Sequence, residues 1–361
     1  MRDNAYAVIL AGGYGERFWP SSTSKRPKQL LSLLSDQTML GMAVDRLEGL
    51  IPPERIIVLT NGDLVAPTRA AAPYLPAENV IGEPMRRDTA AAVALAAAVV
   101  SGRDPNGVFC ILTADHVMGD LPDYRATLDA AMGLALDQEV LVTIGIKPAY
   151  PATAYGYVEE GAAVEVEGPI DFARVERFVE KPDLETAESY VASGSFWWNS
   201  GMFIWSAATV RNAFAQHRPQ LATLIDELAP AVDTDGFADA LAAAFEPLEK
   251  ISIDYALMEK ADNIVMARGV FEWDDVGSWP AVANHFDPDE AGNVVIGDAA
   301  ILDGSNNIVR SEGGMLTALL GVDDLIVVQA EGVTMVCPKD RAEEVKKLVA
   351  LVRDMGRDDL L

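Results

Sequence analysis

The sequence predicts an α/β fold: a Rossmann-like, mostly parallel sheet with helices on both faces, and a small β-rich C-terminal domain that ends in a helix. Short apolar runs alternate with segments of helical spacing through the first half of the chain, which is typical of a parallel sheet. From about residue 285 the apolar runs are shorter and strand-like. A length of 361 residues suits one large domain or two.

The predicted elements of the first half follow this alternation. Each expected strand is a short apolar run, and the first run ends in glycines, a pattern of buried parallel strands. Ligands of such sheets bind beyond the carboxyl ends of the strands, so the residues that follow these runs are candidates for function. We expect strands at residues 6–11, 55–60, 108–113 and 141–147, and helices at residues 38–50, 88–101 and 123–136.

The middle and the tail of the chain differ from the first half. We expect strands at residues 155–166 and 173–180, a helix at 184–193, an aromatic segment at 196–205 and a closing helix at 341–355. Pro, Asp and Gly cluster at residues 287–292, a composition typical of a linker. We therefore predict a larger α/β domain at 1–286 and a β-rich domain at 287–361, for which a left-handed β-helix is one candidate.

Composition excludes several classes of protein. Lys and Arg (28) against Asp and Glu (55) give a net charge of −27, which argues against binding nucleic acid. With three His and two Cys, neither a zinc-finger array nor a disulfide scaffold is expected. No signal peptide and no membrane-spanning run is recognisable in the sequence. We expect a cytoplasmic protein with no membrane partner.

A glycine-rich segment follows the first predicted strand. Gly12, Gly13 and Gly15 leave backbone N–H groups free to approach phosphate oxygens, and Arg17 and Lys28 add two cations. The dinucleotide fingerprint would need a glycine where Phe18 stands, and the P-loop motif G-K-[ST] is absent. The segment is either a phosphate-binding loop or a glycine turn with two solvated cations.

Two acidic segments are candidates for a metal site. Asp115 follows the predicted strand at 108–113, where a carboxylate could hold Mg²⁺ against phosphates. Asp274 and Asp275 lie beside Gly277, and this acidic pair could supply a second ligand of the ion. The alternatives are an Asp that caps the next turn and a solvated acidic turn.

Glu180 and Lys181 follow the strand predicted at 173–180. The Glu carboxylate can accept hydrogen bonds from two sugar hydroxyls, and the Lys can pair with a sugar phosphate. A surface ion pair between the two is the simpler alternative.

Taken in order, these segments resemble the sugar-nucleotide pyrophosphorylases, and among them the mannose-1-phosphate guanylyltransferases. The resemblance covers about residues 5–285. It rests on LAGGYGERFWP, PKQ, GEPMRRDTAAA, TADH, YGYVE, FVEKP, WNSGMFIW, SIDYALMEK and WDDVGSW. Ala154 stands where these enzymes usually carry glycine, which matters if its φ is positive, and Asp88 stands where Asn is common.

The resemblance implies a transferase that converts GTP and mannose 1-phosphate to GDP-mannose and diphosphate. It implies Arg17, Lys28 and Asp115 as catalytic residues, and Asp115 and Asp275 as ligands of Mg²⁺, with Mn²⁺ as an alternative. The expected nucleotide-binding residues are Leu10, Ala11, Gly12, Gly13, Gly15, Glu16, Arg17, Glu83, Arg87, Asp88, Thr89 and Asp115. The expected sugar-phosphate residues are Lys28, Tyr155, Gly156, Glu180, Lys181 and Asn199.

Three alternatives stay open at this stage. A guanylyltransferase for heptose or fucose 1-phosphate would keep the chemistry and change the sugar pocket. A non-catalytic sensor of nucleotide sugars is expected to lack Arg17, Lys28 or an Asp ligand, yet all are present. A nicotinamide oxidoreductase is disfavoured by the failed fingerprint. The tail is too short for the isomerase domain of bifunctional relatives, and it could pair two subunits as a homodimer.

Overall fold

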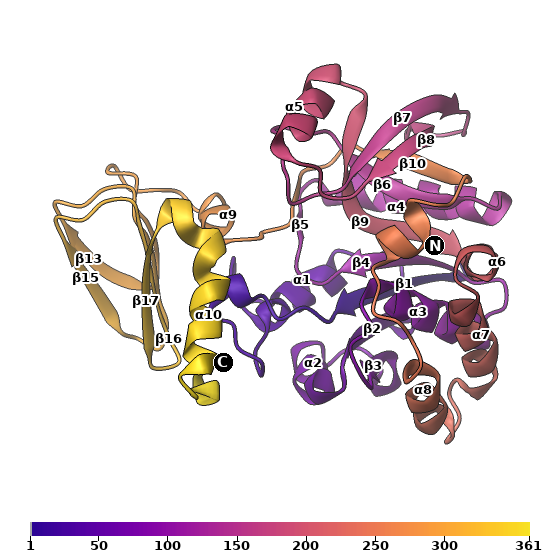
Figure 1. Cartoon of the computed structure of the whole chain (residues 1–361), viewed down its shortest axis with the longest axis horizontal. Coiled ribbons are helices and arrows are strands. Elements are labelled where there is room, and N and C mark those ends of the chain that lie inside the picture. The colour runs from indigo at the N-terminus through magenta and orange to yellow at the C-terminus, as the bar shows by residue number, and fades with distance from the viewer. Residues whose placement is uncertain (1) are drawn as a thin grey trace. The chain divides into compact units, whose positions relative to one another are not determined.

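The computed structural model describes residues 2–361, which form two compact units. The first, here called the sheet unit, comprises residues 2–11, Ala43–Ala114 and Met118–Trp273. The second, here called the tail unit, comprises Gly12–Met42, Asp115–Val117 and Asp274–Leu361. The glycine-rich segment therefore belongs to the same compact unit as the C-terminal strands (Figure 1). No helix among residues 2–361 is both long and apolar enough to cross a membrane.

A nine-stranded sheet forms the centre of the sheet unit, in the order β3-β2-β1-β4-β9-β6-β10-β8-β7. Pairs β1–β2, β1–β4, β2–β3 and β6–β10 are parallel, whereas β9 is antiparallel to β4 and β6, and β8 is antiparallel to β10 and β7. Only β8 and β9 of these nine strands thus run against the others. Because these two strands are interleaved among the others, the sheet is mixed, with four parallel and five antiparallel pairings, where the sequence predicted a mostly parallel one. Its strands are β1 (Ala5–Ala11), β2 (Ile56–Asn61), β3 (Val80–Glu83), β4 (Val108–Thr113), β6 (Leu141–Ile146), β7 (Tyr157–Val164), β8 (Phe172–Val179), β9 (Phe196–Ser206) and β10 (Ile264–Gly269).

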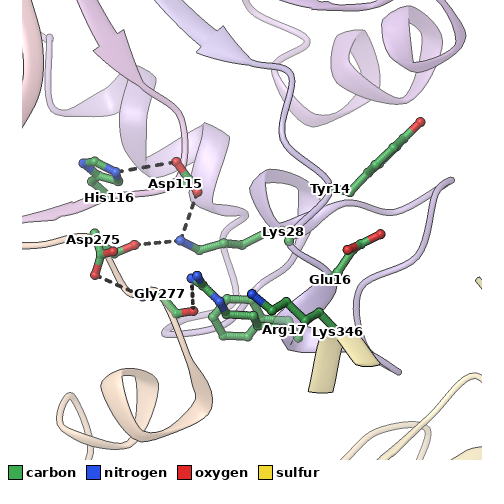
Figure 2. Close-up of a pocket in the computed structure, with 11 residues that line it drawn as sticks. Tyr14, Glu16, Arg17, Lys28, Asp115, His116, Asp275, Gly277 and Lys346 are labelled. Atoms are coloured by element: carbon green, nitrogen blue, oxygen red, sulfur yellow. Dashed lines mark hydrogen bonds and ion pairs between the residues drawn. The ribbon is translucent and has the colours of Figure 1, made fainter. Parts of the chain in front are cut away.

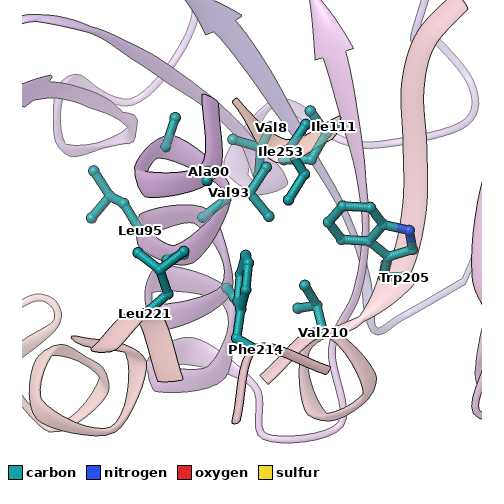
Figure 3. Packing of buried hydrophobic residues seen from close by; sticks show 14 of the residues in the cluster. Val8, Ala90, Val93, Leu95, Ile111, Trp205, Val210, Phe214, Leu221 and Ile253 are labelled. Atoms are coloured by element: carbon teal, nitrogen blue, oxygen red, sulfur yellow. The ribbon is translucent and has the colours of Figure 1, made fainter. Parts of the chain in front are cut away.

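Helices cover both faces of this sheet. Alternate residues of β1 and β4, among them Val8 and Ile111, pack with Val93, Phe214 and neighbours in one buried cluster (Figure 3). This cluster joins the sheet to α3, α6 and α7, whereas α4 contacts β4, β6, β9 and β10 from outside the cluster. The helices are α1 (Met39–Asp45), α2 (Val65–Ala71), α3 (Thr89–Arg103), α4 (Leu121–Asp137), α5 (Leu184–Ser193), α6 (Ala207–His217), α7 (Pro219–Leu228), α8 (Phe237–Phe245), α9 (Trp279–Ala283) and α10 (Val345–Asp354).

Local signals explain where several helices begin. The Asp88 carboxylate caps α3 by accepting a hydrogen bond from the Thr89 amide at 2.8 Å, and Asp183 caps α5 through the Thr186 amide at 2.9 Å. Such caps satisfy amides that lack a partner in the first turn. Helix α5 ends at Gly194, whose φ of 73° is the left-handed conformation typical of helix ends.

The tail unit contains stacked parallel strands. Strands β12, β14 and β16 pair in parallel, β17 is antiparallel to β16, and β13 pairs in parallel with β15. Inside the stack, the buried Asn307 amide donates to the Asn293 side-chain oxygen at 3.0 Å and to the Val322 carbonyl at 2.8 Å. These strands are β12 (Val294–Ile296), β13 (Asp298–Leu302), β14 (Ile308–Ser311), β15 (Leu316–Leu320), β16 (Leu325–Ala330) and β17 (Val333–Pro338). The remaining short strands β5 (Val117–Met118) and β11 (Trp273–Asp274) lie where the chain passes from one unit to the other.

One hydrophobic core joins the glycine-rich segment to the tail. Phe18 and Trp19 are buried with Trp279 of α9, Ile326 of β16 and Val349 of α10, and the Phe18 and Trp279 rings meet edge to face at 5.3 Å. The predicted closing helix is present as α10, preceded by the 3-10 helix η8 (Lys339–Glu344). The segment that carries the predicted phosphate-binding residues is therefore supported by C-terminal residues.

Some elements differ from the sequence-based expectation. Helix α1 ends at Asp45 rather than near residue 50. Strand β3 and helix α2 lie in a stretch for which no element was predicted, and so do α6, α7 and α8. Both cysteines, Cys110 and Cys337, are free thiols, in line with the predicted absence of a disulfide scaffold.

Candidate active site

A pocket of about 500 Å³ opens in the tail unit, around the glycine-rich segment. We call it the basic pocket, because Arg17, Lys28 and Lys346 reach it from three separate parts of the chain (Figure 2). Its lining residues are Tyr14, Gly15, Glu16, Arg17, Phe18, Lys28, Asp115, His116, Asp275, Gly277 and Lys346. Predicted residues of the loop and both predicted metal ligands therefore line one pocket.

Lys28 lies at the centre of the basic pocket. Its ammonium donates to the Asp115 carboxylate at 3.0 Å and to the Asp275 backbone carbonyl at 2.7 Å, and it lies 5.5 Å from the Phe18 ring centroid. Only 5% of the side chain is exposed, so the surrounding atoms restrict the side chain to few rotamers. The structure thus holds a cation at a fixed place beside two acidic residues.

The backbone of the loop approaches Lys28 closely. Gly15 has a φ of 66°, and a Cβ atom at this position would lie 2.4 Å from the Lys28 Cβ. Glycine is therefore required here for two reasons, conformation and space. At Gly13, by contrast, a Cβ would meet nothing within 4 Å.

Arg17 takes part in two contacts within the tail unit. One terminal nitrogen donates to the Gly277 carbonyl at 3.2 Å, and Nε lies 2.8 Å from the Glu343 carboxylate. With 37% of its side chain exposed, the guanidinium remains accessible to an anion from solvent. The Arg17 guanidinium thus binds one carbonyl oxygen and one carboxylate within the protein. A guanidinium also binds phosphate oxygens well.

Asp115 and Asp275 present two carboxylates to the same pocket. Burial would raise the pKa of Asp115, but the charge of Lys28, assisted by His116 and the Lys28 hydrogen bond, holds it below its usual value. The Asp275 carboxylate accepts from the Gly277 amide at 3.2 Å. Its neighbour Asp274 instead binds His285 and the Val276 amide, so the structure distinguishes the two acids.

These carboxylates fit a hard divalent cation. Mg²⁺ is commonly held by one or two carboxylates, together with water and substrate phosphates. Among residues 2–361 no group of three or more His, Cys, Asp or Glu side chains is arranged to hold a metal ion. Asp115 and Asp275 provide the two carboxylates that Mg²⁺ can take beside water and phosphate oxygens.

Four of the predicted sugar-phosphate residues, Gly156, Glu180, Lys181 and Asn199, gather in the sheet unit, and with Asp254 they form what we call the Glu180 cluster. Glu180 and Lys181 form an ion pair, with 8% of the Glu180 side chain exposed. A Cβ atom on Gly156 would lie 2.5 Å from Glu180 Oε2 and 3.4 Å from the Asn199 Cβ. Glu180 and Lys181 are thus paired, but the pair differs from a surface ion pair, because the Glu180 carboxylate is buried and lies beside other predicted residues.

Asn199 connects the cluster to an acid that the sequence analysis did not single out. Its side-chain nitrogen lies 3.3 Å from the Asp254 carboxylate, and its oxygen accepts from the Thr143 hydroxyl at 3.1 Å. Burial, followed by the nearby charge of Glu180, raises the pKa of Asp254 to about 6. Asp254 was present in the SIDYALMEK segment, but a lone acid before an apolar run gives no signal of its own.

Tyr155 belongs to an aromatic group beside the cluster. Its ring contacts Trp198 and Trp273, each at 5.2 Å between centroids. Ala154, which replaces the usual glycine, is not among the residues with positive φ. The alanine is therefore accommodated without backbone strain.

The predicted base-binding residues are arranged around the start of α3. Arg87 donates to the carbonyls of Phe245 and Glu246 at 3.2 and 2.6 Å, and the Thr89 hydroxyl accepts from the Ile253 amide at 2.9 Å. Asp88 has a φ of 68°, an uncommon conformation for a residue other than glycine.

Glu83 ends β3 in the same region. Its burial, and then the charge of Asp88, raise its pKa to about 7. Leu10 and Ala11 end β1, immediately before the glycine-rich segment. Since Gly12, Gly13, Gly15, Glu16 and Arg17 belong to the tail unit, the predicted nucleotide-binding residues are divided between the two units.

We expect the Asp254→Asn variant to be more stable than the parent at pH 8. Because the pKa of Asp254 is raised in the folded protein, its contribution to stability is greatest at low pH and declines as pH rises from about 4 to 6. Removal of the charge should therefore raise the free energy of unfolding at pH 8 by about 2 kcal/mol and change it little at pH 4.

Urea unfolding at pH 4 and pH 8 measures this difference. Asp262→Asn, at an exposed position eight residues further along, is the matched control and should change stability by less than about 0.5 kcal/mol at either pH. An equal effect of Asp254→Asn at both pH values would show that the acid does not titrate as described.

Comparison with known proteins agrees with this arrangement. The chain belongs to a class of nucleotide-transferring enzymes: the family model described as nucleotidyl transferase matches residues 6–291. A second model, the MannoseP isomerase/GMP-like beta-helix domain, matches residues 297–351.

The curated relatives narrow the class to enzymes named for one sugar phosphate. The chain is 37% identical to mannose-1-phosphate guanylyltransferases of Escherichia coli K12 and Salmonella typhimurium, over 98% of this chain and 74% of each relative. A solved structure described as mannose-1-phosphate geranyltransferase from Thermus thermophilus is 36% identical, with a TM-score of 0.86 over 97% of this chain and 99% of that one. The chain belongs to the mannose-1-phosphate guanylyltransferase family.

Proposed function

We propose that this chain transfers the guanylyl group of GTP to mannose 1-phosphate, which gives GDP-mannose and diphosphate. The observation that carries the proposal is the similarity to curated mannose-1-phosphate guanylyltransferases over 98% of the chain. The basic pocket supports it, because it combines cations and carboxylates in the way that nucleotidyl transfer requires. No observation favours a heptose or fucose phosphate as the acceptor, or a non-catalytic sensor.

The reaction needs no protein nucleophile. An oxygen of the mannose 1-phosphate dianion attacks the α-phosphorus of GTP, and a new phosphorus–oxygen bond forms. The bond from the α-phosphorus to the bridging oxygen of the β-phosphate breaks, and that oxygen leaves with diphosphate. Because the attacking oxygen is already anionic at neutral pH, no general base is required, and the main task of the protein is to bring two anions together.

Lys28 and Arg17 supply positive charge for this task. Lys28 has a fixed position, so it can stabilise charge at the α-phosphate without reorganisation. Arg17 binds the β- and γ-phosphates in place of its present contacts with Glu343 and the Gly277 carbonyl. The loop amides from Gly12 to Gly15 approach the same triphosphate.

Asp115 and Asp275 would hold the divalent cation, which we propose to be Mg²⁺, with Mn²⁺ as an alternative. When bound, the ion neutralises charge on the phosphates. In the sheet unit, the Glu180 carboxylate accepts hydrogen bonds from mannose hydroxyls. Lys181 leaves its ion pair with Glu180 and binds the sugar phosphate instead. Glu83, Arg87, Asp88 and Thr89 face the guanine.

Further proposals concern organisation and location. The catalytic domain comprises residues 1–286 and the β-rich domain 287–361. The two free cysteines fit a reducing compartment such as the cytoplasm. A homodimer is testable by light scattering, and a strict monomer at micromolar concentration would exclude it.

Release of diphosphate from defined substrate pairs tests the function. GTP, ATP and UTP are each combined with mannose, glucose and fucose 1-phosphates in the presence of Mg²⁺. Turnover with GTP and mannose 1-phosphate, at least tenfold above every other pair, is expected. A preference for another pair would change the assigned substrates, and no turnover in a folded protein that binds GTP would support the sensor.

The variants Asp115→Asn and Asp275→Asn test the metal site. Each should lower kcat by about 10²-fold and raise the Mg²⁺ concentration for half-maximal rate, because a neutral amide is a weaker ligand. Asp274→Asn is the matched control, since Asp274 binds His285 and the Val276 amide. If Asp274→Asn raised the Mg²⁺ requirement as much as Asp275→Asn, the assignment of Asp275 would be wrong.

A further inference from the structure

Lys346 is a basic residue of the pocket that neither the resemblance nor the sequence pattern identified. It lies in the first turn of α10, among the residues that line the basic pocket with Arg17 and Lys28 (Figure 2). We propose that Lys346 binds the diphosphate portion of the nucleotide, so that the C-terminal helix contributes a residue to the active site. The proposal rests on the proposed function for the identity of the nucleotide.

Lys346 differs from the other two cations of the pocket, which already have partners within the protein. Lys28 is committed to Asp115 and to the Asp275 carbonyl, and Arg17 contacts Glu343 and Gly277. Lys346 has no hydrogen bond or ion pair within residues 2–361, and its side chain is exposed to solvent at the pocket. It can therefore bind an anion without first giving up a protein partner.

The helix that carries Lys346 is fixed in place. Its neighbours Val345 and Val349 are 3% and 4% exposed in the core of the tail unit. A lysine on a mobile tail would lose much conformational entropy on binding a phosphate, whereas the backbone of this one is already ordered. The position of Lys346 is therefore set by packing.

Several contacts join the C-terminal segment to the phosphate-binding loop. Glu343, one turn before Lys346, pairs with Arg17, and Arg353 lies 3.7 Å from Glu16. The Trp19 indole donates to the Leu360 carbonyl at 2.8 Å. The loop and the helix are therefore held together as one surface of the pocket.

The chemistry of the ligand follows from these charges. Arg17, Lys28 and Lys346 gather in one pocket together with three acids, of which Asp115 and Asp275 are the proposed ligands of the divalent cation. A group with several negative oxygens, such as a diphosphate, can contact more than one of these cations at once. A single carboxylate or a neutral sugar offers fewer negative oxygens and would contact fewer of these cations.

Calorimetric titration with inorganic diphosphate and Mg²⁺ tests the proposal on the full chain. Lys346→Ala should weaken binding about tenfold, the loss expected for one charge-assisted hydrogen bond, and Lys346→Arg should stay within about threefold of the parent. Lys347→Ala is the matched control. It makes the same charge change one residue away, where the lysine is exposed and paired with Glu344, and it should change affinity less than twofold.

Steady-state kinetics separates this role from a structural one. Lys346→Ala should raise the KM for GTP and leave the KM for mannose 1-phosphate unchanged. Equal diphosphate affinities of Lys346→Ala and Lys347→Ala, or a parent protein that does not bind diphosphate, would overturn the inference. Failure of the proposed function has a different signature, because it would leave a diphosphate site that depends on Lys346 in a protein that uses another substrate pair or none.

Discussion

Lys28→Met is expected to lower kcat by about 10²- to 10³-fold while the protein still folds. The ammonium lies between the Asp115 carboxylate and the Asp275 carbonyl at 3.0 and 2.7 Å, so methionine removes the charge but keeps much of the side-chain volume against Phe18. Loss of one preorganised group that stabilises charge in the transition state has this magnitude. Initial rates at saturating GTP and mannose 1-phosphate measure the effect.

Lys25→Met is the matched control for this substitution. Lys25 is exposed and lies three residues earlier, so its removal makes the same change of net charge and should alter kcat less than twofold. Thermal unfolding of both variants checks that the parent fold is retained. A Lys28→Met enzyme with more than a tenth of the parental kcat would show that Lys28 does not act on the reacting phosphates.

The double variant Lys28→Met, Asp115→Asn separates charge balance from catalysis. Without Lys28, the Asp115 carboxylate loses the charge that lowers its pKa, and part of any loss of stability would come from that unpaired acid. Asparagine at 115 should restore thermal stability and leave kcat low. If asparagine at 115 did not restore thermal stability to the Lys28→Met protein, the unpaired acid would not be the cause of the loss.

Local sequence signals predicted much of the sheet unit. Helix α5 has the bounds that were predicted, because Asp183 caps its first turn and Gly194 ends it. The buried strands β4 and β6 were evident as apolar runs between charged residues. Helices α6, α7 and α8 were missed, although α7 has the buried residues Leu221, Leu224 and Ile225 at helical spacing, a pattern that could have been recognised.

The direction of each strand in the sheet could not be predicted from the local sequence. Strands β8 and β9 run against the rest of the sheet, and β9 pairs with β4, β6 and β7. An apolar run predicts a buried strand but does not state which neighbours it will have. Pairing between segments far apart in the chain sets the direction.

The candidate site also contains residues that the sequence predicts and residues that only the folded structure reveals. The glycines, Arg17, Lys28 and Asp115 could be proposed from the residue types that phosphate and Mg²⁺ require, whereas the choice of Asp275 over Asp274 came from the family resemblance. Lys346 could not, because in the sequence it is indistinguishable from Lys347, and only the packing of α10 in the tail unit brings one of the two to the pocket. Asp254 was likewise hidden, since its importance comes from the proximity of Asn199 and Glu180.

Gly15→Ala is expected to impair both folding and catalysis, whereas Gly13→Ala is expected to do neither. Alanine at 15 must keep a φ of 66°, and its Cβ would lie 2.4 Å from the Lys28 Cβ. The conformation costs about 1–2 kcal/mol, and the contact can be relieved only if the loop or Lys28 moves. A shift of about 1 Å in a positioning group can cost about 10²-fold in rate, so kcat/KM for GTP should fall by that amount.

Urea unfolding and initial rates on the two alanine variants distinguish the causes. At Gly13 an added Cβ meets nothing within 4 Å, and the substitution should leave stability within about 0.5 kcal/mol and the rate within about threefold. If both variants lost activity equally, flexibility of the loop would be the property that matters. If only Gly15→Ala does, the close approach of the loop backbone to Lys28 is what fixes the catalytic cation, and the glycine is retained for the geometry of that lysine.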